Sequence, residues 1–412
     1  MTIWLVEPRD PLIVRDGRPF SPDSGAWAAS LPFPFPSTIA GGVRRRSALD
    51  EDGAFKYEQD DKEQLKQLKG IRIRGPLLVQ LADEGDALAP DENAWLVPMP
   101  NDVQLFATDA EGVVRLLRFV PLTLPAGAQT DFAQQSREQQ LLLVGQSRAA
   151  ALPRKPLAHA LRYWYWQPFQ TWLIDPAQLE QEDDLPLSSL GREDLLHERR
   201  LHVSMDSERE MGKEGLLFGT SGLEFTHPGA QKQRLHKARR LALAVDVDET
   251  NVTFRGGVAS FGGERRIVTW RQSNAHLPPC PKEIKQAIKR DGHCRLVLLT
   301  PAHFAEGYYP SWLRTTHAQQ CGVDVELRAI AVRRPQVVSG WDLALGRPKS
   351  SRRLAAAGTV LFLSVKAASD AALEIWIERT WMHCMSDDEQ SRCDGFGLAV
   401  LGTWSGQPVA MQ

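Results

Sequence analysis

Pairs of adjacent glycines followed closely by arginines occur at two places in the sequence, and such segments can hold phosphate groups. The first is PSTIAGGVRRR, in which Gly41 and Gly42 precede Arg44 and Arg46. Each glycine costs a helix about 1 kcal/mol relative to alanine, which is tolerable where another backbone packs closely. Arginines at the end of such a helix offer guanidinium groups to an anion. The competing interpretation is a packed helix whose basic end is stabilised by the helix dipole.

The second place is FGGERR, in which Gly262 and Gly263 precede Arg265 and Arg266. The two glycines allow a backbone to approach a ligand, and their N–H groups can face a phosphate. The competing interpretation is a hairpin turn with exposed arginines.

Two further segments carry a histidine or an aromatic ring beside glycines. His202 lies in HVSMD, ahead of GLLFGTSGLEF. Histidine titrates near neutral pH and can act in general acid–base cleavage of RNA, although a lone histidine is more often structural. Gly395, Phe396 and Gly397 come directly before the last predicted strand, where the absence of side chains permits close approach and Phe396 can pack or stack. A structural turn is the equal competitor there.

The common catalytic signatures are missing from the sequence. It contains no GxxxxGK[ST], HExxH or GxSxG motif, and GFGLAVLG departs from the dinucleotide-binding GxGxxG pattern. Asp246 and Asp248 could share one face of a strand, and His383 lies near Cys384 and Cys393, but neither set has the spacing of a complete metal site. The sequence therefore predicts neither a metal nor a cofactor.

Charge is nearly balanced overall but divided unevenly along the chain. The 412 residues hold 49 Lys and Arg against 51 Asp and Glu, a net charge of -2, which argues against a nonspecific polycation. Residues 49–63 hold seven acids and two bases, and residues 175–194 hold seven acids and one base. Residues 231–271 hold nine bases and four acids, and residues 328–353 hold seven bases and one acid. The basic segments indicate solvated loops or one face that binds an anionic partner.

The cysteines and apolar runs bear on the compartment. Five cysteines without CxxC spacing fit a reducing cytosol. The N-terminus lacks the pattern of a secretory signal, and the longest uncharged apolar run, near 354–365, is too short to span a bilayer. We therefore expect a cytoplasmic protein that does not bind membranes.

The second half alternates strands and helices in a recognisable order. Pro281 begins a helix that Gly292 ends, and Leu373, Ile377 and Trp381 form one stripe of another. The predicted elements are a strand at 241–247, a helix at 281–290, strands at 295–300, 323–338 and 358–365, a helix at 371–382 and a strand at 396–404. This order matches a ferredoxin-like βαββαβ unit with one extra strand.

The first half gives a looser version of the same pattern. Strands are predicted at 3–6, 12–15, 71–81, 116–122, 201–205 and 216–225, with helices at 39–49 and 159–173, the second broken or kinked at Pro168. Polar segments near 50–68, 83–94, 125–150 and 174–194 exceed normal loop lengths and are predicted to be insertions that carry function or disorder. The predicted fold class is α+β, with two ferredoxin-like (RRM-like) domains at residues 1–235 and 236–412 and long insertions.

Taken together, five segments resemble the RAMP superfamily of CRISPR-associated proteins, and more narrowly the third-subunit family of type III-B (Cmr) effector complexes. They are WLVEPRDPLIVRDGRPF, PFPSTIAGGVR, HVSMD with GLLFGTSGLEF, FGGERR and GFGLAVLG, in order from residue 4 to residue 402. Each motif is weak alone, but the ordered set is specific. The polar insertions and Asp394, just before the glycine turn, depart from the family pattern.

The resemblance implies two ferredoxin-like domains and a noncatalytic subunit that holds the 5′ tag of CRISPR RNA. It implies a place between the large polymerase-like subunit and the backbone subunits, in antiviral defence, with target RNA cut by a backbone subunit. The RNA-binding residues expected from it are Gly41, Gly42, Arg44, Arg46, His202, Gly262, Gly263, Arg265, Arg266, Gly395, Phe396 and Gly397. Two alternatives stay open: a metal-independent endoribonuclease that processes CRISPR RNA through His202 or another histidine, and a scaffold without RNA contact.

Overall fold

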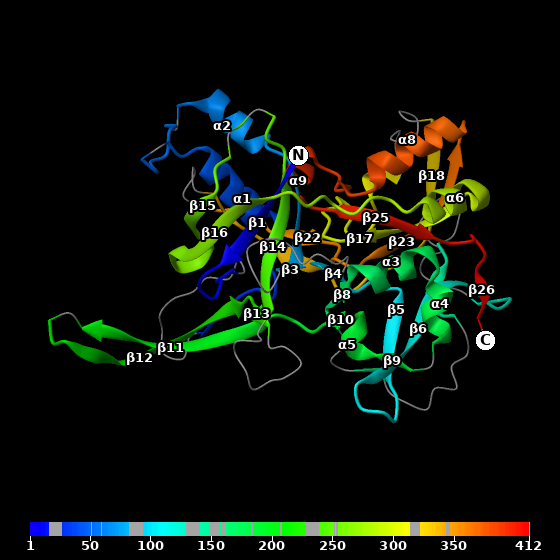
Figure 1. Cartoon of the computed structure of the whole chain (residues 1–412), viewed down its shortest axis with the longest axis horizontal. Helices are drawn as coiled ribbons and strands as arrows, with labels where there is room; N and C mark the ends of the chain where they lie inside the picture. Colours follow the sequence, from blue (N-terminus) through cyan, green and yellow to red (C-terminus); the bar gives the residue numbers. More distant parts are fainter. Residues whose placement is uncertain are drawn as a thin grey trace. The chain divides into compact units, whose positions relative to one another are not determined.

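A computed structural model describes residues 1–15, 27–50, 52–58, 60–81, 94–128, 141–147, 156–157, 161–182, 184–206, 208–227, 239–250, 252, 254–313, 322–342 and 347–411. The chain is a mixed α+β protein, as the sequence predicts (Figure 1). It forms two compact units that interleave along the sequence. Unit 1 contains residues 1–94, 194–276 and 337–352, and unit 2 contains residues 95–193, 277–336 and 353–412. The predicted boundary at residue 235 lies outside the described residues.

Unit 1 contains an antiparallel sheet in the order β3-β14-β1-β16-β15. Its strands are β1 (Thr2–Pro8), β3 (Ile73–Gln80), β14 (Arg239–Val247), β15 (Gly257–Phe261) and β16 (Arg266–Ser273). The sequence analysis assigned β14 to the same sheet as the C-terminal strands, and this assignment is wrong, because β14 pairs with β1 and β3. Residues 241–247 of β14 are all buried, as expected for a central strand covered on both faces.

Two helices belong to unit 1. Helix α1 (Pro36–Ser47) begins with proline in its first turn, where the ring fixes a helical φ and no hydrogen bond is lost. It buries Ile39, Ala40 and Val43 on one stripe and carries three arginines in its last turn. Helix α2 (Lys62–Lys69) overlaps the polar segment 50–68, which is predicted from the sequence to be an insertion that carries function or disorder.

A long hairpin is the third part of unit 1. Strands β11 (Leu196–Asp206) and β12 (Met211–Glu224) pair along most of their length, and β2 (Trp27–Ala28) pairs with β12. In Figure 1 the hairpin extends beyond the strands of the unit 1 sheet. The sequence analysis predicted two shorter strands here.

Unit 2 contains an antiparallel sheet in the order β18-β23-β17-β25-β24. Its strands are β17 (His293–Leu298), β18 (Val323–Ala331), β23 (Val360–Ala367), β24 (His383–Cys384) and β25 (Leu398–Thr403). Helices α6 (Lys282–Asp291) and α8 (Asp370–Thr380) pack on it, as predicted. Gly292 ends α6 in the left-handed conformation, and the Ser369 hydroxyl accepts from Ala372 N–H at the start of α8.

A second group of strands in unit 2 surrounds β6 (Val113–Thr123). Helix α3 (Trp166–Ile174) is shorter than predicted, because residues 163–165 form a strand and Pro168 lies in the first helical turn, where proline is tolerated. Residues 174–194, predicted to be an insertion, contain α4, α5 and two short strands. The remaining elements are β4 (Trp95–Pro98), β5 (Val103–Ala107), β7 (Leu143–Gln146), β8 (Tyr163–Tyr165), α4 (Pro176–Gln181), β9 (Leu185–Pro186), α5 (Leu187–Leu190), β10 (Gly191–Arg192), β13 (Thr226–His227), β19 (Gln336–Val338), β20 (Trp341–Asp342), β21 (Arg347–Pro348), β22 (Arg352–Leu354), α9 (Glu389–Cys393) and β26 (Val409–Ala410).

A buried ion pair joins three parts of unit 2. Arg295 Nη1 on β17 lies 2.5 Å from Asp102 Oδ2, and the two side chains are 3% and 1% exposed. Trp172 Nε1 on α3 donates to Asp102 Oδ1 at 2.9 Å. Arg295 also donates to the carbonyls of Thr403 at 2.9 Å and Trp172 at 2.6 Å. Both charges are therefore hydrogen-bonded as well as paired, which a buried ion pair requires.

Candidate nucleic-acid interface

The two glycines of α1 have different environments. A side chain at Gly42 would place its Cβ 2.5 Å from the Phe261 ring and 3.3 Å from the Trp270 ring, whereas Gly41 faces open space. Gly42 therefore lets the helix pack closely on β15 and β16. This contact supports the interpretation of the segment as a packed helix.

Arg44 and Arg46 both use their guanidinium groups on backbone carbonyls. Arg44 donates to Leu68 and Lys69 carbonyls at 3.0 and 2.9 Å, which satisfies the C-terminal end of α2. Arg46 donates to the carbonyls of Arg255 and Gly256, and burial lowers its pKa. These contacts hold α1 to its neighbours. The guanidinium group of Arg45, between them, is exposed and has no hydrogen-bond partner among the described residues.

The Gly262–Arg266 turn joins β15 to β16. Gly262 has φ +72°, and a Cβ there would lie 2.6 Å from the Ile13 carbonyl oxygen. Gly263 N–H donates to the same carbonyl at 2.7 Å. Glycine is thus required by the close approach of the 11–15 segment, and the Gly263 N–H is already bonded within the protein.

The two arginines of this turn also differ. Arg266 is 15% exposed and its Nη2 lies 3.3 Å from Glu264 Oε2. Arg265 is exposed, has φ +52°, and has no partner among the residues that the structure describes. Arg15 contributes a further guanidinium 3.6 Å from Glu264. Arg265 is therefore the member of the pair that can meet a phosphate.

His202 lies on one face of the β11–β12 hairpin, which we call the stacking face: Arg200, His202, Phe218 and Thr220. The rings of His202 and Phe218 stack with centroids 5.3 Å apart and an interplanar angle of 16°. His202 Nε2 lies 3.0 Å from Thr220 Oγ1. Arg200 is half-exposed, pairs with Glu198 at 2.9 Å and is within electrostatic range of Glu264.

The opposite side of the hairpin is the apolar face: Leu201, Val203 and Leu217, with Trp27. Leu201 is 69% exposed, and Trp27 packs against Gly219, opposite Leu201 in the strand register. The Arg199 guanidinium lies 5.8 Å from the centroid of the Trp27 ring. The sequence analysis missed this face, although apolar residues at alternate positions from 201 to 205 are a signal for it.

The Gly395-Phe396-Gly397 turn is buried in unit 2. Phe396 is 0% exposed. The N–H groups of the three residues donate to the carbonyls of Arg392, Ser391 and Pro301 at 3.2, 3.0 and 2.8 Å. A Cβ at Gly397 would lie 2.7 Å from Ser386 N. The turn is thus committed to packing, which argues against direct contact of these residues with a ligand.

The carboxylates and cysteines considered for metal binding do not form a metal site in the described part of the chain. Asp246 is buried and paired with Arg74; desolvation raises its pKa, and Arg74 opposes that shift. No group of three or more His, Cys, Asp or Glu side chains among the described residues has the arrangement of a metal site.

The structure brings together three of the predicted segments. The 11–15 segment joins two of them, because Leu12 pairs with Leu223 of β12 and Ile13 accepts from Gly263. Gly42 of α1 packs on Phe261, next to that turn. The fourth segment, Gly395–Gly397, belongs to unit 2.

Comparisons with known proteins bear on the family of the chain. A family model described as CRISPR-associated protein (Cas_Cmr3) matches residues 4–404. Similar solved structures are two cryo-EM structures of the Type III-B Cmr-beta complex bound to cognate target RNA. The one that also contains AMPPnP has a TM-score of 0.45 and 16% identity, and the other has 0.44 and 15%; each match covers 87% of this chain and 86% of the other. No curated protein sequence gives a significant match. No helix in the described part of the chain is long and apolar enough to cross a membrane.

Nearly the whole sequence is covered by the family match, and the ordered glycine and arginine segments are distributed along it. The chain belongs to the Cas_Cmr3 family of CRISPR-associated proteins.

Proposed function

We propose that this protein is a noncatalytic RNA-binding subunit of a type III-B effector complex, which holds the 5′ tag of CRISPR RNA and bridges the large subunit to the backbone subunits. The observation that carries the proposal is the half-exposed stack of His202 on Phe218, beside Arg200 and the arginine turn. Single-stranded RNA offers splayed bases and phosphates, and proteins bind it with aromatic platforms and guanidinium groups.

The exposed cations near this stack supply the electrostatic part. Arg265 and Arg15 are exposed, and Arg200 is half-exposed. Carboxylates of Glu264 and Glu198 lie among them, so the surface is mixed rather than uniformly basic. Such a surface favours binding of a fixed tag at defined phosphates over nonspecific coating of RNA.

The His202 environment favours a binding role over a catalytic one. Acid–base cleavage needs two groups placed on either side of the reacting phosphate. The hydrogen-bond partner of the ring, among the described residues, is the hydroxyl of Thr220, and its face is occupied by Phe218. The apolar face of the same hairpin suits contact with neighbouring subunits, because contiguous exposed apolar side chains mark interaction sites.

We also propose that both units are ferredoxin-like domains. A βαββαβ unit gives an antiparallel sheet in the order 2-3-1-4. Numbered along the chain, β17, β18, β23 and β25 have this order in unit 2, with α8 between the third and fourth strands. In unit 1, β1, β3, β14 and β16 have the same order, with α1 between the first and second.

Crosslinking in the assembled complex tests the proposed function. With a photoreactive nucleotide at each tag position of the guide RNA, we expect crosslinks to the hairpin or the 262–266 turn. Phe218→Ala should reduce them, whereas Phe55→Ala, an exposed aromatic elsewhere in unit 1, should not. If no crosslink joins this chain to the tag, the protein is a scaffold without RNA contact.

A cleavage assay tests the alternative that the protein is an endoribonuclease. Purified protein incubated with repeat RNA should leave it intact. Site-specific cleavage that disappears in His202→Ala would make the protein an endoribonuclease and refute the noncatalytic proposal.

A further inference from the structure

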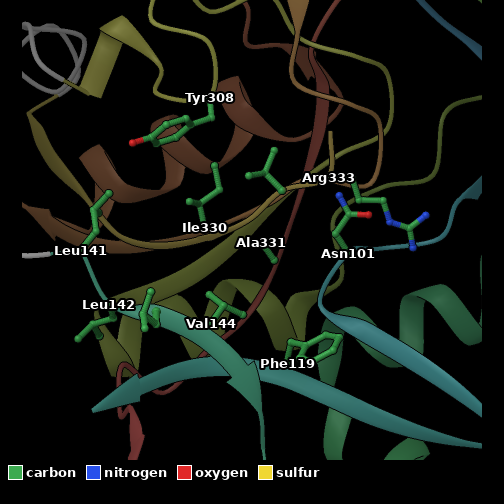
Figure 2. Close-up of a pocket in the computed structure, with 11 residues that line it drawn as sticks. Asn101, Phe119, Leu141, Leu142, Val144, Tyr308, Ile330, Ala331 and Arg333 are labelled. Atoms are coloured by element: carbon green, nitrogen blue, oxygen red, sulfur yellow. The ribbon is translucent and has the colours of Figure 1, made fainter. Parts of the chain in front are cut away.

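An open cavity of about 380 Å³ lies within unit 2, in the size range of small-ligand sites. Its walls are mostly apolar and include Phe119 of β6, the segment 141–144 that leads into β7, and Ile330 at the end of β18 (Figure 2). Tyr308 and Asn101 complete the lining, with Arg333 beside Asn101 in the view. The basic segment 328–353, identified in the sequence, begins at this cavity.

Asn101 and Phe119 are held in fixed positions. Phe119 N–H donates to the Asp102 carbonyl at 2.8 Å, and Asn101 N–H donates to the Gly358 carbonyl at 2.7 Å. The Asp102 side chain is itself anchored by Arg295. Gly358 has φ +85°, and a Cβ there would lie 3.2 Å from Asn101 Oδ1. Asn101 and Phe119 are therefore held beside one cavity by a hydrogen-bonded backbone.

The Asn101 side-chain amide has no hydrogen-bond partner among the described residues. Both Oδ1 and Nδ2 are shielded from solvent and make no hydrogen bond with any described residue. A buried polar group in this state destabilises the folded protein. Such a group needs an explanation, and a ligand that supplies both a donor and an acceptor provides one.

Arginines lie at one end of the cavity. Arg333 is among its lining residues, and Arg333 and Arg334 are both exposed. Desolvation lowers the pKa of Arg333, and the nearby positive charge of Arg162 lowers it further. Within the described residues Arg333 has no carboxylate partner. Its guanidinium group can therefore bind an anion such as a phosphate.

We propose that this cavity takes one nucleobase of the guide RNA, with the Asn101 amide on the hydrogen-bonding edge of the base and Arg333 on a flanking phosphate. The inference rests on the proposed RNA-binding function and adds a second contact site, in unit 2. Apolar and aromatic walls fit the faces of a base, and asparagine commonly binds a base edge through two hydrogen bonds. This contact requires the Asn101 side chain to turn toward the cavity, because both amide atoms are shielded from solvent in the structure.

An abasic scan of the guide RNA in the assembled complex tests this inference. Binding is measured with fluorescein-labelled guides that each lack one base. For the wild type, removal of one particular base should weaken binding about tenfold, as expected for one stacked base. Val144→Phe, which fills the cavity, and Asn101→Ala should both bind the intact guide more weakly and lose the sensitivity at that position.

Two controls keep the result interpretable. Asn274→Ala, an exposed asparagine of unit 1, should retain the wild-type scan. Asn101→Ala removes an unpartnered amide, so its thermal stability should equal or exceed that of the wild type.

The possible outcomes separate the two proposals. If the wild type binds guide RNA, but Val144→Phe and Asn101→Ala give the same abasic scan as the wild type, the base site is refuted and the proposed function stands. If Val144→Phe instead releases a neighbouring subunit, the cavity binds a protein side chain and the inference is overturned. If the complex holds the guide without any contribution from this chain, the proposed function fails and the inference fails with it.

Discussion

The buried pair of Asp102 and Arg295 permits a quantitative test of how unit 2 is held together. Asp102→Asn keeps the shape of the side chain and an acceptor for Trp172 Nε1, which lies 2.9 Å from Oδ1. It removes the charge that faces Arg295, whose guanidinium stays buried at 3% exposure. Removing one partner of such a pair costs about 3–5 kcal/mol, because the other charge stays buried and uncompensated.

The complementary change, Arg295→Met, leaves the Asp102 carboxylate without its cation. It also removes the donors to the Thr403 and Trp172 carbonyls. We therefore expect a loss at least as large as that of Asp102→Asn. In the double variant neither charge remains, so the total loss should fall short of the sum of the two single losses by about 2 kcal/mol or more.

Urea unfolding followed by tryptophan fluorescence measures these free energies, because Trp164 and Trp172 are fully buried in unit 2. Arg290→Met is the matched control, since Arg290 in the same unit is 73% exposed and pairs with Asp291 at the surface. Its unfolding midpoint should not move. A loss below about 1 kcal/mol in Asp102→Asn, or strict additivity in the double variant, would refute the reasoning.

Four further predictions concern other parts of the chain. Gly41→Ala should stabilise α1 by about 0.5–1 kcal/mol, whereas Gly42→Ala should destabilise the protein by about 1–3 kcal/mol, because its Cβ would collide with Phe261. Thermal unfolding of both variants measures these changes, and equal effects would contradict the packing of α1 on Phe261. Arg265→Ala should lower the salt dependence of RNA binding by about one phosphate contact, while Arg266→Ala and the control Arg290→Ala should leave the slope unchanged. Burial acts to raise the pKa of Glu180, but hydrogen bonds from Ser147 and Arg118 outweigh it and the pKa lies below the ordinary 4.5. The wild type should therefore be more stable to unfolding than Glu180→Gln above pH 4.5, and this difference should disappear as the pH falls below that value. Denaturation curves at several pH values measure the difference. A difference that grew in acid would contradict the lowered pKa. Burial raises the pKa of the Cys280 thiol to about 12, so iodoacetamide at pH 8 should modify it only in denaturant, and mass spectrometry that found it alkylated in the folded protein would contradict this.

Local signals in the sequence identify the helices well. The proline before α6, Gly292 after it and the serine before α8 mark boundaries through backbone chemistry that needs no distant partner. The start of α3 was missed, because proline signals both a helix break and a first helical turn.

Sheet membership depends on partners far along the chain and could not be predicted. β14 reads as a strand from its sequence, but its neighbours are residues 2–6 and 73–80. Alternation alone cannot tell which of two sheets a buried strand joins.

The candidate site shows the same limit. The spacing of glycine and arginine indicated segments of interest, but the partners of Arg44 and Arg46 are carbonyls of residues 68–69 and 255–256. The cavity at Asn101 has no sequence signal of its own, because its walls come from separate parts of the chain. By contrast, Trp27 and the alternating apolar residues of β11 could have indicated the apolar face.

The interleaving of the two units also has a consequence for how the protein is made. The chain passes between units after residues 94, 193, 276, 336 and 352, so unit 1 has all of its segments only when residue 352 has left the ribosome. β1 is among the first segments synthesised, yet its partners lie at 239–247 and 266–273. At about 5–20 residues per second the apolar strand waits on the order of tens of seconds for them. During synthesis β1 therefore stays without its sheet partners, and separate expression of either half would yield an unfinished sheet.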